Sequence, residues 1–88
     1  MAVNATETHF LECLAYHQND SGEISHYNLN AMPKKRGAHK TIRVTPNQLA
    51  SASSLKKILL AHGILYLASS SEHNELLKLL FKNPPTAV

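Results

Sequence analysis

A dense group of cations in the middle of the chain is its strongest chemical signal. Five Lys and Arg side chains fall within ten residues: Lys34, Lys35, Arg36, Lys40 and Arg43. Gly37 lets this segment bend, and His39 adds a further positive charge when it is protonated. Cations on a flexible loop neutralise phosphates with little demand on geometry, so the cluster predicts salt-dependent, sequence-independent binding of a nucleic-acid backbone. The alternative is a solvated loop that only adds solubility.

One aromatic side chain upstream of the cluster, Tyr27, is a weaker candidate for the same site. Aromatic rings bind single strands by stacking on bases, and Tyr27 lies in a segment whose side chains alternate in polarity. The alternation fits an inward, core-packing position for Tyr27 equally well. The predicted nucleic-acid-binding set is therefore the five cations, with His39 and Tyr27 as secondary members.

The charges of the chain are unevenly distributed. Residues 1–23 hold four acidic side chains and no Lys or Arg, whereas residues 24–71 hold seven Lys and Arg and no acidic side chain. The formal net charge of +3 therefore conceals a polarised molecule. Such a charge distribution attracts polyanions, chiefly nucleic acid, or an acidic surface on a protein partner.

Six histidines and one cysteine raise the question of a metal site. Along a strand, the four-residue steps from His9 to Cys13 and on to His17 each span about 13 Å, which is too far for one ion. The other histidines are scattered and make no pair at metal-ligand spacing. We expect neither a metal nor another cofactor.

The sequence also lacks a catalytic signature. Cys13 has no activating neighbour, and the three glycines are isolated rather than grouped in a phosphate-binding loop. Glu72 and Glu75 are best explained as helix stabilisers, because the dipole favours negative charge in a first turn. We therefore expect a binding domain and not an enzyme.

The lone cysteine and the polar N-terminal segment predict a reducing, cytoplasmic setting. Cys13 cannot form an internal disulfide, and the first residues have no apolar secretory core. No apolar run approaches the roughly 20 residues that cross a bilayer, so we expect no membrane contact.

Alternating apolar residues predict three strands, at 9–17, 24–32 and 40–45. In the first, parity puts Phe10, Leu14 and Tyr16 on one face. In the third, Ile42 and Val44 point inward and Arg43 outward. Turn-forming residues at 19–22 join the first two strands as a hairpin, and the basic loop joins the second to the third.

The second half of the chain, from Thr45 on, contains residues that are typical of helix starts and ends. Thr45, Pro46 and Gln48 predict a helix start with a capping box, and Gly63 predicts its end. Serines at 51, 53 and 54 leave open one bent helix or two short ones, with Ser53 or Ser54 as the second cap. Residues 64–67 predict a fourth strand, and a leucine-rich helix follows until Asn83.

These elements predict a single α+β domain over residues 1–82, with 83–88 as a linker or tail. We expect a mainly antiparallel sheet of three or four strands with two or three helices packed on one face. The order is three strands, a helical region, a strand and a final helix.

The order of motifs resembles a known family. Four motifs together are similar to the N-terminal module of a domain of unknown function. They are the turn Asn19-Asp20-Ser21-Gly22, the strand TIRVTPNQLA, the helix ending at Leu59 to Gly63, and the leucine helix before a proline-containing segment. That domain occurs in phage- and plasmid-encoded putative helicases and primases. The resemblance implies an accessory role in mobile-element DNA replication, beside an ATPase or helicase domain in the same or another chain. DNA is the nucleic acid that this setting favours.

A competing function is a protein-interaction or oligomerisation module that binds no nucleic acid. Its candidate interface is the terminal helix around Leu76, Leu80 and Phe81, which could hold a homodimer together. The same side chains fit a core-facing helix stripe, so the sequence leaves both uses open.

Overall fold

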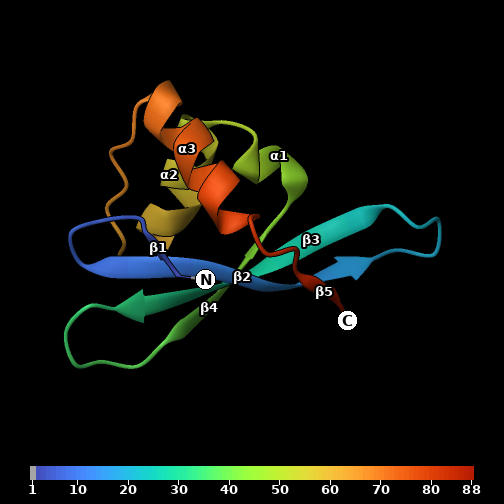
Figure 1. The fold of residues 1–88 in the computed structure, drawn as a ribbon, viewed down its shortest axis with the longest axis horizontal. Coiled ribbons are helices and arrows are strands. Elements are labelled where there is room, and N and C mark those ends of the chain that lie inside the picture. The colour runs from blue at the N-terminus through green and yellow to red at the C-terminus, as the bar shows by residue number, and fades with distance from the viewer. Residues whose placement is uncertain (1) are drawn as a thin grey trace.

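The computed structural model describes residues 2–88 and has the expected α+β architecture. Four antiparallel strands lie in chain order: β1 (Val3–Asn4), β2 (His9–Gln18), β3 (Ile24–Pro33) and β4 (Lys40–Val44). Three helices, α1 (Pro46–Leu49), α2 (Ala52–Ala61) and α3 (Ser70–Leu80), lie together on one side of this sheet (Figure 1). A fifth strand, β5 (Thr86–Ala87), pairs in parallel with β2.

Alternation in β3 and β4 builds the core as the sequence predicts. Leu29 pairs with Ile42, and Tyr27 pairs with Val44, so these side chains share the helix-facing side. Leu29, Ile42 and Val44 are fully buried there. Arg43, one residue out of step with its neighbours, consequently lies on the opposite face of the sheet.

The parity predicted for the first strand is wrong beyond Cys13. Between Cys13 and Ala15 the register with β3 shifts, because Leu14 is an extra residue in β2. After this bulge Tyr16 lies opposite Tyr27 on the helix-facing side, whereas Phe10 stays on the other face. Leu14 itself is exposed.

Of the two arrangements that the serines left open, the structure has the two short helices. Thr45 and Gln48 form the expected capping box, with Pro46 at the first helical position of α1. Ser51, and neither Ser53 nor Ser54, caps α2 by accepting the backbone N–H of Ser54. The helix ends at Ala61 with His62 as its C-cap, and Gly63 follows with a φ of 75°, the left-handed conformation that favours glycine.

The strand predicted at 64–67 is also wrong. Residues 64–68 are extended, and Ile64 and Tyr66 are buried while Leu65 and Leu67 are exposed, but no strand pairs with this segment. Its alternating pattern reflects packing of one side onto the core. The pattern alone does not show whether a neighbouring strand is present.

The last residues continue the sheet, although a linker or tail was expected at 83–88. Thr86 and Ala87 lie beside Ala15 and Tyr16, and the backbone N–H of Val88 donates to Tyr16 O at 2.9 Å. A two-residue strand carries too little alternation to be seen in a sequence. The same is true of β1, which pairs with Leu11 and Phe10.

Candidate nucleic-acid interface

The helices leave one face of the sheet uncovered (Figure 1). Register and alternation place the following residues on this uncovered face: Phe10, Glu12, Ala15 and His17 of β2, His26, Asn28, Asn30 and Met32 of β3, and Thr41 and Arg43 of β4. Most of them are polar, and Phe10 is 36% exposed. An aromatic ring among polar and basic groups on an open sheet is a surface that can bind a single strand by stacking and charge.

The carboxylate among those residues, Glu12, is engaged within the sheet. Asn30 Nδ2 donates to Glu12 Oε1 across the β2–β3 pair at 3.1 Å. Asn28 lies directly opposite Arg43 on the next pair. Glu12 therefore has an amide partner, and Arg43 supplies a positive charge on the same face.

Arg43 belongs to a group of basic side chains at one end of the uncovered face. The rings of His17 and His26 stack with centroids 5.3 Å apart and an interplanar angle of 17°. Partial burial lowers the pKa of His26, and the charges of Arg43 and His17 lower it further. The His26 ring is therefore mostly neutral near pH 7 and gains its charge only in more acidic solution.

The basic loop, residues 34–39, joins β3 to β4, and its first cation is fixed to the sheet. Lys34 Nζ donates to Asn4 Oδ1 and lies 5.1 Å from the centroid of the Phe10 ring. The Lys34 backbone N–H donates to Thr8 O at 2.9 Å. These contacts hold the start of the loop beside Phe10.

Lys40 also has an intramolecular role. Its Nζ donates to the carbonyl oxygen of His62 at 2.8 Å, at the end of α2. A cation at this position satisfies a carbonyl that the helix leaves unpaired and interacts favourably with the helix dipole. Lys40 therefore joins the start of β4 to the helix layer.

The other three cations have no such partner among residues 2–88. Lys35, Arg36 and Arg43 are exposed, and they make no ion pair or side-chain hydrogen bond within that range. His39 is exposed on the same loop. The predicted cluster thus divides into two structural lysines and three cations that are available to a ligand.

Tyr27 lies on the helix-facing side, which is the inward alternative that its alternation allowed. Its ring is 5.1 Å from that of Phe81, at 60°, and burial raises the pKa of its hydroxyl. Tyr27 is therefore separated by the sheet from Arg43, and Phe10 is the aromatic residue beside the loop. Sequence reasoning missed Phe10, His17 and His26, because their shared face follows from the strand register.

The structure corrects the alternative interface proposed on the terminal helix. Leu76 and Leu80 are buried in the protein's own core, at 6% and 2% exposure, and Phe81 packs on Tyr27. Leu76 and Leu80 are therefore not available to a partner in the folded domain, whereas Phe81 remains partly exposed. The exposed apolar side chains of this region are Leu65, Leu67 and Leu79.

Neither a metal site in the described part of the chain nor a similarity to a known protein indicates another function for this surface. Within residues 2–88, no three His, Cys, Asp or Glu side chains gather as a metal site requires, and no helix is long and apolar enough to cross a bilayer. Comparison of the chain with protein-family models, curated proteins and solved structures gives no match.

Proposed function

We propose that this chain is an accessory nucleic-acid-binding domain whose contact surface joins the basic loop to the uncovered face of the sheet. The observation that carries the proposal is the division of the cation cluster. Lys35, Arg36 and Arg43 are exposed and have no acidic partner in the described part of the chain, so their charge is available to phosphates.

The shape of the surface favours a single strand. The loop is placed to contact phosphates, and Phe10, held beside it by Lys34, offers a ring for stacking on a base. The polar side chains of β3 and β4 then continue the surface as far as Arg43 and His26. The resemblance described above supplies the proposed setting, which is phage or plasmid DNA replication beside a helicase or primase domain.

Fluorescence anisotropy of labelled single-stranded and duplex DNA, at 50 mM and 200 mM salt, tests the proposal. If three phosphates are neutralised, single-strand affinity should fall by about 20-fold over this fourfold salt change, and duplex affinity by about 40-fold. A triple variant, Lys35→Gln, Arg36→Gln and Arg43→Gln, should lose most of both the binding and the salt dependence.

A matched control separates location from net charge. Changing Lys56→Gln, Lys57→Gln and Lys82→Gln removes the same number of positive charges from exposed sites away from the loop. This control should retain most of the wild-type affinity. Equal loss in both triple variants, or no wild-type binding at low salt, would refute the proposed surface.

A further inference from the structure

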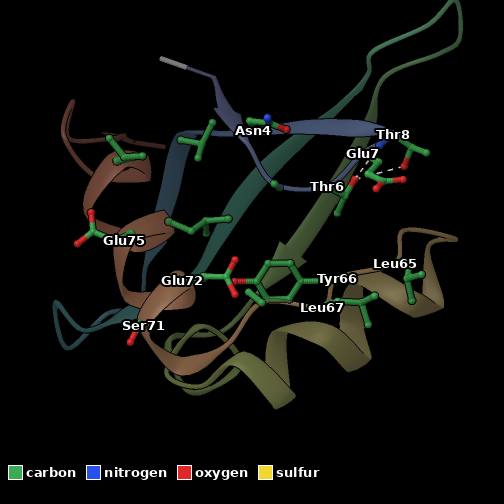
Figure 2. Close-up of a pocket in the computed structure, with 15 residues that line it drawn as sticks. Asn4, Thr6, Glu7, Thr8, Leu65, Tyr66, Leu67, Ser71, Glu72 and Glu75 are labelled. Atoms are coloured by element: carbon green, nitrogen blue, oxygen red, sulfur yellow. Dashed lines mark hydrogen bonds between the residues drawn. The ribbon is translucent and has the colours of Figure 1, made fainter.

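A groove of about 650 Å³ lies at the β1 edge of the sheet, and no residue of the basic loop lines it. One wall is β1 with the loop that follows it, which carries Asn4, Thr6 and Glu7 (Figure 2). The second wall is formed by residues 65–68 of the extended segment, and the third is α3, which presents Glu72 and Glu75. The groove is large enough to hold several residues of an extended chain.

The lining of the groove is mainly apolar, and three of its leucines are exposed. Leu65, Leu67 and Leu79 are 54%, 71% and 45% exposed, and all three line it. Below them the buried side chains of Tyr66 and Leu76 form part of the lining. Exposed leucines beside carboxylates can contact the apolar and basic side chains of another chain.

Both long walls also offer main-chain hydrogen-bonding groups. Within residues 2–88, no backbone N–H or C=O of residues 65–68 makes a hydrogen bond. Strand β1 pairs with β2 and with no other strand, so its outer edge is unpaired. Unpaired strand edges are templates for an added strand, and such pairing gives affinity through the main chain.

The charge of the groove indicates the chemistry of its occupant. Glu7, Glu72 and Glu75 line it, and no Lys or Arg does. Hydrogen bonds from Ser69 lower the pKa of Glu72, so this carboxylate stays ionised. Glu75 has one cationic neighbour, Lys78 at 3.4 Å, but both side chains are well exposed, so this pair is weak and readily exchanged.

We propose that the groove binds an extended peptide segment of a partner protein, one in which basic and apolar residues alternate. The peptide pairs its main chain with the edge of β1 or with residues 65–68. Its apolar side chains contact Leu65, Leu67 and Leu79, and its Lys or Arg side chains reach the three carboxylates. This proposal does not rest on the proposed nucleic-acid binding, although Asn4 and Thr8, which line the groove, also hold Lys34 at the start of the basic loop.

The probe is a fluorescein-labelled seven-residue peptide of alternating lysine and valine, with binding followed by anisotropy. A peptide of alternating glutamate and valine tests charge, and a lysine–valine peptide methylated on alternate main-chain nitrogens tests strand pairing. Leu67→Gln should weaken binding about tenfold or more, because it removes a central apolar contact. Its matched control, Leu60→Gln, changes a similarly exposed leucine on α2 that does not line the groove.

We expect the lysine–valine peptide to bind best and the methylated peptide to bind much more weakly. Amide NMR shifts should concentrate at residues 3–8 and 65–68. Equal binding by the lysine and glutamate peptides, equal effects of Leu67→Gln and Leu60→Gln, or shifts confined to other surfaces would overturn the proposal. A wild-type dimer in sedimentation that Leu67→Gln dissociates would instead identify a second copy of the chain as the occupant.

Discussion

The hydroxyl oxygen of Tyr66 lies 2.8 Å from Nδ1 of His73, and both side chains are almost completely buried. His73 Nε2 lies 2.7 Å from Leu49 O. Because a carbonyl oxygen only accepts, Nε2 carries the proton and Nδ1 accepts from Tyr66. Burial raises the pKa of Tyr66 to about 12, so the hydroxyl keeps the proton that it donates. This pair joins α1, the extended segment and α3, which include two walls of the groove.

Replacing Tyr66 by Phe should therefore destabilise the fold by about 1–3 kcal/mol, because Nδ1 of His73 is left buried without a partner. Urea unfolding followed by circular dichroism measures the change in the free energy of unfolding. The control is Tyr16→Phe, since the Tyr16 hydroxyl makes no hydrogen bond to any residue from 2 to 88. If both variants lose the same stability, the buried hydrogen bond contributes nothing specific.

The lowered pKa of His26 predicts that DNA binding strengthens in acid. Near pH 7 the ring is mostly neutral, and protonation below its ordinary value of 6.5 adds a charge beside Arg43 and His17. A bound phosphate favours that charge, so affinity at fixed ionic strength should rise as the pH falls from 7.5 to 5.5. In His26→Gln this rise should be smaller, as anisotropy titrations at each pH would show.

The same lowered pKa has an opposite consequence for folding. The folded state binds the His26 proton less readily than the unfolded state does, so this group makes the fold less stable as the pH drops below about 6.5. Circular dichroism at each pH must therefore verify that the protein remains folded during the titrations. An unchanged pH dependence in His26→Gln would remove His26 from the binding surface.

Cys13 should react slowly with thiol reagents. It is 6% exposed, and burial raises its pKa from 9.0 to about 11, against a smaller lowering by a backbone hydrogen bond at Ala15. Because the thiolate is the reactive form, the native protein at pH 8 should hold about 100-fold less thiolate than the unfolded chain. The rates of reaction with Ellman's reagent, with and without 6 M urea, measure the combined effect of lower thiolate content and hindered access to the sulfur. Equal rates would contradict the buried position of Cys13.

Strong local patterns predicted the main elements of the fold from the sequence. The alternation in β3 and β4, the capping box at Thr45 and the left-handed Gly63 each depend on a few adjacent residues. The bulge at Leu14 and the two short strands depend on pairing between distant segments, which local patterns do not contain. Residues 64–67 show the reverse error, because burial of one side imitates a paired strand.

The same distinction applies to the candidate site. Composition identified the cation cluster, and the parity of β4 correctly put Arg43 on the outward face. Sequence did not show that Lys34 bonds to Asn4 or that Lys40 bonds to His62, because both contacts join segments more than 20 residues apart. The structure therefore changed which lysines are expected to contact a ligand.

Lys35 and Lys40 should consequently respond differently to the same substitution. Lys40→Met removes the hydrogen bond to His62 O at the end of α2, so the free energy of unfolding should fall by about 0.3–1 kcal/mol. Lys35→Met removes a cation without an intramolecular partner in the described range, so stability should stay unchanged. Its effect should be on DNA affinity, and the slope of log affinity against log salt should become shallower by the contribution of about one phosphate contact.

Urea unfolding and salt-dependent anisotropy on both variants separate the two roles. If Lys40→Met weakens DNA binding as much as Lys35→Met while leaving stability intact, Lys40 belongs to the interface, and the division between structural and available cations is wrong.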